Sequence, residues 1–287
     1  MQLPSESALR SGPVPTGPRL SAVVAVRDEE AMLPGCLRCL GFADEVIVAL
    51  DDRTTDRSAE IAESAMAVVL PVHFTNFSDL KNAGLKKARG QWVLIVDADE
   101  RVTRTLADEI GHALERTASA FRIPRKNYFF GQEMRAGAWE RERPVRLFRR
   151  GEAEFVGDVH EQLRLANGAN DVDTLSNPLI HFSHRSIAQS LRKTIIFGEL
   201  QATELLRAGA PKVTWRTYFR VIGREFVRRM VLHRGYRDGT IGVIEAIYQP
   251  FSLFTVYVRL WELQRSPPLD VVYERLDQEA AGRANER

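Results

Sequence analysis

Acidic residues gather at two points of the sequence where carboxylates could bind a cation together. Each group directly follows a short apolar run: Asp51 and Asp52 after residues 45–50, and Asp97, Asp99 and Glu100 after residues 91–96. A single Asp after a strand is an ordinary turn former or helix cap, but one turn does not need a cluster. The mutual repulsion of clustered carboxylates is commonly relieved by a divalent cation, and Mg²⁺ and Mn²⁺ favour oxygen ligands. The spacing therefore predicts a cation site whose shell is completed by the phosphate oxygens of a ligand.

The elements that must position these acids alternate along the first half of the sequence. Four runs rich in Val and Ile predict strands, at residues 20–26, 45–50, 65–71 and 91–96. Helical patterns follow them at 30–40, 56–64, 78–89 and 105–116, with Thr55 or Asp56 and Thr105 as the expected N-terminal caps. This alternation predicts a Rossmann-like α/β domain with a mostly parallel sheet flanked by helices. Ligands bind at the carboxyl ends of such strands, so both acidic groups should face one crevice.

Composition and the first residues narrow the class of protein. The sequence has 287 residues, 44% of them apolar, and a formal charge of +2, which indicates a globular protein and gives no reason to expect a nucleic-acid partner. Residues 1–19 are rich in Pro, Ser and Gly and lack the hydrophobic region of a secretory signal, so we expect a disordered leader and a cytoplasmic protein. Cys36 and Cys39 lie inside an apolar helical pattern, which favours inert core thiols over a redox pair.

The ordered motifs resemble glycosyltransferase family 2, whose nucleotide-sugar domain has the GT-A fold. The resemblance spans roughly residues 20–262 and rests on "SAVVAVRDEEAMLPGCLRCL", "DDRTTDRSAEIAE", "LKNAGLKKARGQWVLIVDADE" and "GAWERERPVRLFRR". The third segment ends in the Asp-x-Asp element. The fourth (137–150), followed by "VHE" (159–161), is similar to the lipopolysaccharide-core glucosyltransferase branch. The resemblance implies transfer of a hexose from a nucleoside-diphosphate sugar.

The resemblance also assigns residues to the donor site, namely Val26, Asp28, Glu30, Asp51, Asp52, Lys81, Asp97 and Arg146. Asp52, with Asp51 beside it, would bind the base or ribose, and Lys81 would lie near the base and phosphates. Asp97 would face the ribose or the water shell of the cation. Asp99 would ligate the Mg²⁺ or Mn²⁺ that bridges the diphosphate, and a UDP-hexose is the expected donor. Such a cation stabilises the charge that develops on the departing phosphate.

An inverting transfer also needs a base that removes the proton of the acceptor hydroxyl. Glu142 occupies the place where this branch carries an Asp and is the expected base; the alternative is a solvated charge in a segment of alternating charges. His160 and Glu161 are the second choice, as base, acceptor contact or cation ligand. Arg53 and Pro144 depart from the family pattern, and Arg53 could contact a phosphate or alter the choice of nucleotide.

The C-terminal third carries helical patterns instead of strand patterns. Within residues 212–262, arginines recur every four residues beside an apolar stripe: Arg216, Arg220, Arg224 and Arg228 beside Phe219, Ile222, Phe226 and Met230. Such a helix is typical of contact with an anionic membrane surface; the alternative is a helix that packs its apolar stripe on the catalytic domain. Residues 239–258 are almost long enough to span a bilayer, but Glu245, Gln249 and Pro250 favour an interfacial or partly buried helix pair.

These patterns predict a GT-A domain over 20–184, a helical, membrane-associating extension over 185–265 and a flexible tail over 266–287. The expected function is metal-dependent inverting glycosyl transfer to a glycan or lipid-linked acceptor, in cell-envelope or lipopolysaccharide-type biosynthesis at the inner face of the membrane. A sugar-phosphate nucleotidyltransferase is disfavoured, because the turn after the first strand is acidic where that class needs a Gly-rich, basic loop. A non-catalytic descendant that binds a sugar nucleotide or a membrane is the other alternative, and turnover separates it from an enzyme.

Overall fold

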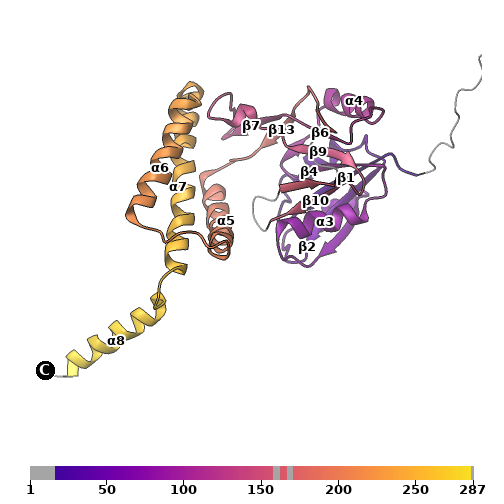
Figure 1. Ribbon diagram of the computed structural model, residues 1–287. Helices are drawn as coiled ribbons and strands as arrows, with labels where there is room; N and C mark the ends of the chain where they lie inside the picture. Colours follow the sequence, from indigo (N-terminus) through magenta and orange to yellow (C-terminus); the bar gives the residue numbers. More distant parts are fainter. Residues whose placement is uncertain (1–16, 158–161, 167–170, 286–287) are drawn as a thin grey trace, which may run out of the picture.

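A sheet domain with helices on its faces lies beside a group of long helices in the computed structural model (Figure 1), which describes residues 17–157, 162–166 and 171–285. The four predicted strands form at the expected places: β1 (Leu20–Val26), β2 (Glu45–Asp51), β3 (Val68–Val72) and β4 (Trp92–Asp97). They pair in parallel in the order β4-β1-β2-β3. β1, β2 and β4 are buried on both faces, as parallel strands between helices require, whereas β3 at the edge of the sheet is partly exposed.

Further strands complete the sheet domain beyond the four that the patterns predicted. The large sheet has the order β12-β6-β9-β4-β1-β2-β3 and gains β6 (Ala120–Arg122), β9 (Val145–Arg149) and β12 (Val172–Thr174). A second sheet consists of β5 (Glu100–Arg101), β13 (Leu179–Phe182), β7 (Arg125–Phe129) and β8 (Gln132–Glu133). β10 (Ala153–Val156) and β11 (Gln162–Leu165) form a separate antiparallel pair. The second sheet carries several residues of the candidate site.

Helices cover both faces of the large sheet, which confirms the α/β prediction. On one face, Val24 of β1 packs in a core with residues of α1 (Leu33–Arg38), α2 (Ser58–Ser64) and α4 (Arg104–Ala113). On the other face, the neighbouring Val23 packs in a core with Leu85 of α3 (Phe77–Lys87). Gly84 permits the close approach of α3, since a Cβ there would lie 2.4 Å from Val23 Cγ1.

Two expectations about local structure need correction. The cap of α4 is Thr103 and not Thr105, because the Thr103 hydroxyl accepts a hydrogen bond from Leu106 N at 3.2 Å. The tail expected to fray forms a helix in the structure, α8 (Leu269–Asn285). Its sequence is polar and charged, and intrinsic helix formers such as Ala, Glu and Arg supply the propensity that the composition argument neglected.

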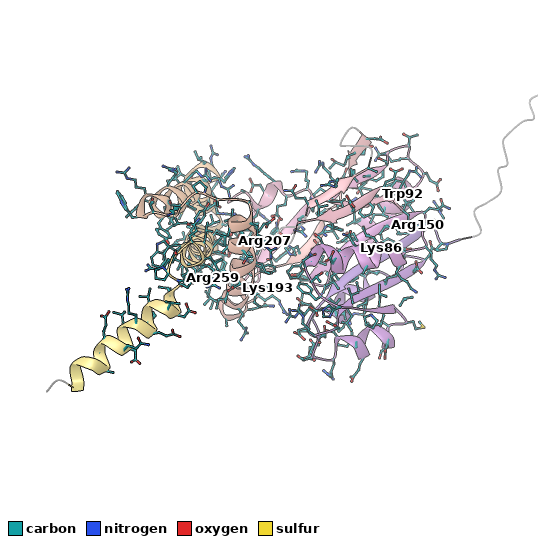
Figure 2. The ribbon with its side chains drawn as sticks, turned by 60° about the horizontal axis from the view of Figure 1, so that its bottom comes forward. Lys86, Trp92, Arg150, Lys193, Arg207 and Arg259 are labelled. Atoms are coloured by element: carbon teal, nitrogen blue, oxygen red, sulfur yellow. The ribbon has the colours of Figure 1, made fainter. Side chains whose placement is uncertain are left out.

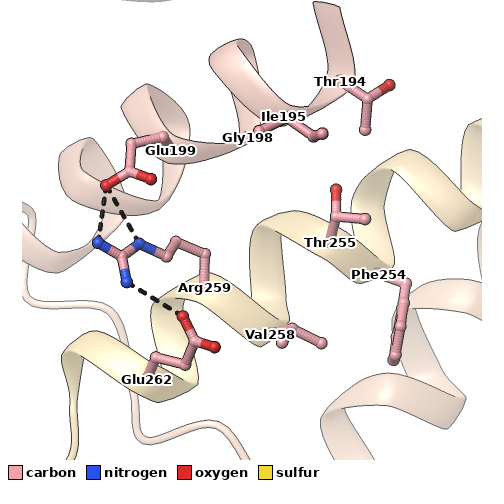
Figure 3. Close-up of a pocket in the computed structure, with 9 residues that line it drawn as sticks. All are labelled: Thr194, Ile195, Gly198, Glu199, Phe254, Thr255, Val258, Arg259 and Glu262. Atoms are coloured by element: carbon pink, nitrogen blue, oxygen red, sulfur yellow. Dashed lines mark hydrogen bonds and ion pairs between the residues drawn. The ribbon is translucent and has the colours of Figure 1, made fainter. Parts of the chain in front are cut away.

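The helical extension contains three long helices, with α7 (Gly239–Leu263) between α5 (Ile187–Arg207) and α6 (Trp215–Val227). A short π-helical turn (Arg228–Leu232) and a 3₁₀ turn (Gly235–Asp238) join α6 to α7. A pocket of about 220 Å³ lies between α5 and α7. Arg259, one of the residues that line it, pairs with Glu199 and Glu262 (Figure 3). α7 runs through Pro250 as one helix.

α7 has the length and apolar character of a membrane-crossing helix, but it is also tied to the sheet domain. Residues Gly235–Leu263 have a mean hydropathy of 1.3 in their most apolar window, of which 28% is buried within the protein. Glu245 in this helix is fully buried and lies 2.6 Å from Nδ1 of His184, which follows β13. His184 stacks on Phe129 of β7, with ring centroids 4.5 Å apart. This buried pair and its aromatic contacts hold α7 against the second sheet.

Candidate active site

The acids predicted for the donor site lie at one edge of the large sheet. β1, β2 and β4 run in parallel, and their registers pair Val26 with Leu50 and Ala25 with Asp97. The turns after these strands therefore adjoin, as the order of strands and helices predicted. Val26 itself is a buried core residue of β1, so its side chain positions the turn and does not face the crevice.

Asp51 and Asp52 differ in what they offer to a ligand. Asp51 is fully buried and accepts hydrogen bonds from Arg53 N, Nε and Nη2 at 2.8–3.0 Å. Burial opposes ionisation, but the Arg53 bonds outweigh it and lower the pKa of Asp51. Asp52 is 40% exposed and lies 2.8 Å from His73 Nδ1, while the Arg53 guanidinium covers the Phe74 ring at 4.2 Å. Asp51 thus shapes the turn, and Asp52 is the carboxylate that faces solvent.

Asp28 and Glu30 connect the turn after β1 to the turn after β2. Asp28 adopts a left-handed backbone conformation (φ 51°), which Asp tolerates better than most residues, and its Oδ1 accepts a hydrogen bond from Thr55 N at 2.8 Å. Glu30 Oε2 accepts a hydrogen bond from Arg57 N at 3.3 Å. Both acids therefore fix the relative position of the two turns.

Asp97 lies among three cationic side chains. Its carboxylate pairs with Lys81 Nζ (3.2 Å), Arg125 Nη2 (3.0 Å) and Arg146 Nη2 (2.5 Å). Buried Glu100 shares both arginines and also accepts a hydrogen bond from Asp97 N at 2.9 Å. Burial would raise the pKa of Asp97, but the cations, Arg146 foremost, hold it well below its usual range. Asp97 and Glu100 are therefore neutralised by the protein's own cations.

This cluster changes the roles expected for Asp97 and Arg146. A cation ligand must tolerate a second positive charge nearby, and three cationic groups within 3.2 Å of Asp97 oppose a metal ion there. Arg146 is only 5% exposed, and its guanidinium faces two carboxylates instead of offering a free fork to a diphosphate. Asp97, Arg146 and Lys81 thus form a buried ionic support beneath the crevice.

Asp99 has a different environment from Asp97. Its Oδ1 lies 3.6 Å from Nε2 of His181 on β13, and its side chain is 17% exposed. Burial acts to raise the pKa of Asp99, but the contact with His181 outweighs burial and lowers it. Asp99 therefore keeps an ionised carboxylate opposite an imidazole nitrogen, without a guanidinium or ammonium group in an ion pair with it among the described residues.

Asn127 connects this pair to the predicted base. Its Nδ2 donates to Glu142 Oε2 at 3.1 Å and to Trp139 O at 3.0 Å, so its Oδ1 is the atom that faces His181 Nδ1, at 2.6 Å. His181 Nδ1 must then carry a hydrogen, and Nε2 faces Asp99. Nε2 donates a hydrogen toward Asp99 when the imidazole is protonated and offers a lone pair to a cation when the imidazole is neutral. Glu142 is partly exposed and lies 3.7 Å from Arg125 Nη1. Asp99, His181, Asn127 and Glu142 form one continuous series of contacts, referred to below as the Asn127 network.

Asp99 and His181 fit a divalent cation that takes further ligands from a substrate. A lone-pair nitrogen and a carboxylate oxygen 3.6 Å apart can both face one ion. An imidazole in the ligand set favours a transition-series ion such as Mn²⁺ over Mg²⁺, which prefers oxygen. Within residues 17–157, 162–166 and 171–285, three or more His, Cys, Asp or Glu residues are nowhere grouped to hold a metal ion. Phosphate oxygens of a ligand would have to complete the shell.

Sequence patterns missed Arg125, Asn127 and His181. These residues lie on β7 and β13, in a part of the sequence for which the hydrophobic runs predicted no strands. The signal that could have found β7 is the alternation in "RKNYF", where Asn127 and Phe129 are buried between partly exposed neighbours. Asn127 is a buried polar residue whose partners are distant in sequence, and a pattern of local hydropathy carries no information about them.

Glu29 is a further acid at the mouth of the crevice. Burial raises its pKa, partly offset by Lys193, whose Nζ lies 3.9 Å from Glu29 Oε1. Lys193 belongs to α5 and lies on the side of the helical extension that faces the sheet domain (Figure 2). The extension therefore contributes a cation to the rim of the site. His160 and Glu161, the second choice for the base, lie outside the described residues.

The Cys pair has no place in this chemistry. Cys36 and Cys39 are free thiols at α1 and its end. Burial raises the pKa of Cys36, which keeps its thiol protonated, and Cys39 Sγ donates to Gly35 O at 3.1 Å. Both observations support the interpretation as structural thiols.

Comparison with known proteins gives the same family as the motifs. A lipopolysaccharide core biosynthesis glycosyltransferase, LpsC of Rhizobium meliloti, is 24% identical over 264 residues, covering 88% of this chain and 96% of the relative. An uncharacterized glycosyltransferase of Rickettsia bellii is also 24% identical over 264 residues, covering 85% and 87% of the two chains. Among solved structures, S. aureus TarS with UDP-GlcNAc has a TM-score of 0.48 and 15% identity, covering 86% of this chain and 90% of that one.

The family profile described as "Glycosyl transferase family 2" matches residues 21–163. This segment contains β1 to β4, the Asp-x-Asp element and Glu142. The chain is an enzyme that belongs to glycosyltransferase family 2.

Proposed function

We propose that this glycosyltransferase moves a hexose from a nucleoside-diphosphate sugar to an acceptor hydroxyl with inversion at the sugar carbon. The observation that carries the proposal is the Asn127 network, which joins a two-ligand cation site at Asp99 and His181 to a partly exposed carboxylate at Glu142. An inverting transfer needs both a cation at the leaving diphosphate and a base on the acceptor side.

Asp99 and His181 would hold the cation, which supplies charge stabilisation to the departing diphosphate when it is bound. The imidazole in this pair supports Mn²⁺ over Mg²⁺. Asp52, at the carboxyl end of β2, is the exposed carboxylate suited to hydroxyl or base donors of a nucleotide, while Asp51 and Arg53 hold its turn in place. A UDP-hexose remains the proposed donor.

Glu142 would take the proton of the acceptor hydroxyl as that oxygen forms a bond to the sugar carbon. The bond between the sugar carbon and the diphosphate oxygen breaks in the same step, so one glycosidic bond replaces the bond to the nucleotide. Asn127 and Arg125 orient the Glu142 carboxylate from one side and leave part of it exposed to an acceptor. Asp97, Glu100 and their cations hold Arg125 in place below it.

The acceptor class rests on sequence similarity and on the character of the helical extension. LpsC, whose similarity to this chain extends over most of the length of both proteins, is named for lipopolysaccharide core biosynthesis. We therefore propose a glycan or lipid-linked acceptor in cell-envelope or lipopolysaccharide-type biosynthesis, with the enzyme at the inner face of the cell membrane.

Calorimetric titration with UDP, GDP, ADP and dTDP, each with and without Mn²⁺, tests the donor site. We expect one nucleotide to bind tightly only in the presence of the cation. The base is tested by release of that nucleotide from its hexose conjugate in the presence of an acceptor. Glu142→Gln should lower kcat by roughly 10²- to 10⁴-fold with nucleotide binding unchanged.

Glu140→Gln is the matched control for the base, because Glu140 lies in the 3₁₀ turn Trp139–Arg141 that ends just before Glu142, and it pairs only with the neighbouring Arg141 among the described residues. It should retain wild-type turnover. Equal losses in the two variants would rule out a specific role for Glu142. Nucleotide binding without any turnover of the wild-type chain would instead support the non-catalytic alternative.

A further inference from the structure

Large apolar side chains are exposed on the outer helices of the extension. On α6 and the turns that follow it, Trp215, Phe219 and Leu232 are 66%, 76% and 69% exposed. α7 adds exposed Ile247 and Phe251 beside them. Of the apolar stripe predicted for α6, Phe219 is exposed, and Ile222 and Phe226 line a groove with residues of α7 instead of packing on the catalytic domain. Exposed aromatic and aliphatic residues in such a group are typical of an interaction surface.

Cationic side chains accompany this apolar group. Every charged side chain that is exposed between residues 211 and 244 is basic: Lys212, Arg216, Arg220, Arg224, Arg234 and Arg237. The two acids in this range, Glu225 and Asp238, are buried and have partners within the protein. Glu225 pairs with Arg228 and Arg229, and Asp238 accepts backbone hydrogen bonds from the loop after β8. The surface formed by these six cations and by the exposed apolar residues of α6 and α7 is called the basic apolar face below.

The apolar and the basic side chains of α6 lie on two adjacent sides of the helix. Trp215, Phe219 and Phe226 share one side of the helix, and the helical repeat places Arg216, Arg220 and Arg224 on the adjacent side. Between α6 and α7 lies a groove of about 290 Å³ whose lining is entirely apolar: Ile222, Phe226, Ile247, Pro250, Phe251 and Phe254. An apolar stripe with cations along its edge matches a bilayer interface, where acyl chains meet anionic headgroups.

We propose that the basic apolar face docks on an anionic lipid bilayer. A second copy of the chain is a poor occupant, because six exposed cations on each copy would face like charges. A neutral apolar partner would leave these cations unpaired. An anionic bilayer satisfies both parts of the face, since headgroups attract the arginines and the interface accepts the aromatic side chains. The inference depends on neither the donor nor the base.

The docking face is continuous with the loop that carries Glu142. Arg229 Nη1 donates to Gly137 O at 3.1 Å, and its guanidinium lies 4.6 Å from the centre of the Trp139 ring. Gly137 N in turn donates to His233 O at 2.9 Å. A bilayer bound to the basic apolar face would therefore lie beside the same segment that holds the loop of the proposed base, within reach of a lipid-linked acceptor.

Vesicle co-sedimentation of the full chain tests the inference. We expect binding to vesicles that contain phosphatidylglycerol, weak binding to pure phosphatidylcholine, and a loss of binding as salt concentration rises. The triple variant Arg216→Glu, Arg220→Glu, Arg224→Glu should bind at least roughly a hundredfold less tightly. Trp215→Ser with Phe219→Ser should also weaken binding, while the remaining binding keeps its salt dependence.

The matched control carries the same change of charge on the sheet domain: Arg38→Glu, Lys86→Glu, Arg104→Glu. These side chains are exposed, and Lys86 lies on the sheet domain, remote from α6 (Figure 2). The control should bind vesicles almost as the wild type does.

Equal losses in the two triple variants would overturn the assignment of the face, as would an absence of wild-type binding at low salt. A dimer in sedimentation velocity that dissociates only in the Trp215 and Phe219 variant would assign the face to a second copy instead. Nucleotide binding without vesicles, measured on every variant, separates these outcomes from a failure of the proposed reaction.

Discussion

The carboxamide oxygen of Asn127 lies 2.6 Å from Nδ1 of His181 and thereby fixes which nitrogen of that imidazole carries the hydrogen. The same carboxamide donates to Glu142, so one buried side chain orients groups on the leaving-group side and on the acceptor side of the proposed reaction. Residues that orient a metal-binding His contribute substantially to metal affinity although they touch no metal.

Asn127→Ala should therefore weaken Mn²⁺-dependent nucleotide binding by roughly 10- to 100-fold and lower kcat as well. The measurement is the Mn²⁺ concentration at half-maximal nucleotide binding, followed by calorimetry. Asn82→Ala is the control, since Asn82 also makes two hydrogen bonds, but to the backbone of Phe155 outside the Asn127 network. If both variants shift the Mn²⁺ requirement equally, the effect is one of stability and the orienting role is refuted.

Removal of the carboxylate should lower the stability of the protein at Asp97 but should leave it nearly unchanged at Asp99. Asp97→Ala removes the carboxylate that Lys81, Arg125 and Arg146 share, while Arg125 and Arg146 keep their contacts with Glu100. Breaking such a buried ionic group costs about 3–5 kcal/mol. Asp99→Ala should keep the stability of the wild type to within about 1 kcal/mol, because among the described residues Asp99 is in ion-pair contact with His181 alone.

The two variants are compared by urea unfolding and by calorimetry with Mn²⁺ and nucleotide. Asp99→Ala should lose cation-assisted binding while it unfolds at nearly the same urea concentration as the wild type. Asp97→Ala should unfold at much lower urea. Unchanged activity of Asp99→Ala would contradict the cation site, and wild-type stability of Asp97→Ala would contradict the supporting role of the ionic cluster.

Glu29 should make the protein less stable as pH rises. Burial raises the pKa of Glu29 in the folded state above the ordinary value of 4.5, with Lys193 offsetting part of this effect. The folded protein therefore holds the proton more tightly than the unfolded chain, and the stability contributed by protonated Glu29 is lost as pH rises through the raised pKa. Glu29→Gln should remove this loss and become more stable than the wild type above that pH.

Thermal unfolding of the wild type and Glu29→Gln between pH 4 and pH 7 measures the difference. The gap in Tm between the two proteins should widen toward pH 7. A constant gap would show that Glu29 has the same proton affinity in the folded and unfolded states. Lys193→Ala should enlarge the penalty, because it removes the cation nearest to Glu29.

The strands β1 to β4 and the positions of Asp52 and Asp99 could be predicted from sequence, because the patterns that indicate them are local. Val-rich and Ile-rich runs marked β1 to β4, and the order of strands placed Asp52 and Asp99 at one edge of the sheet. The partners of Asp97 could not be predicted, because Lys81, Arg125 and Arg146 come from three distant segments and only packing brings them together. The same limit hid His181, whose strand pairs with β7 more than fifty residues earlier in the sequence.

Asp238 should couple the helical extension to catalysis through the loop after β8. Its carboxylate accepts hydrogen bonds from Arg135 N (3.1 Å) and Ala136 N (2.8 Å), and this loop continues to Glu142. Asp238→Ala leaves these backbone groups without their acceptor, which costs about 1–3 kcal/mol. It should lower kcat with little change in nucleotide affinity, since the proposed donor residues lie in the turns after β1, β2 and β4 and on β13.

Asp44→Ala provides a matched comparison for this last variant. Asp44 also accepts two backbone hydrogen bonds, from Arg19 N at 2.8 Å and Leu20 N at 2.9 Å, but it does so at the start of β1, at the opposite end of the strands from the site. Both variants should lower Tm by similar amounts, whereas only Asp238→Ala should reduce kcat at a temperature where both are folded. If kcat falls equally in both, loop position does not depend on the extension. A selective loss in Asp238→Ala would mean that the helices which carry the basic apolar face also set the position of the proposed base.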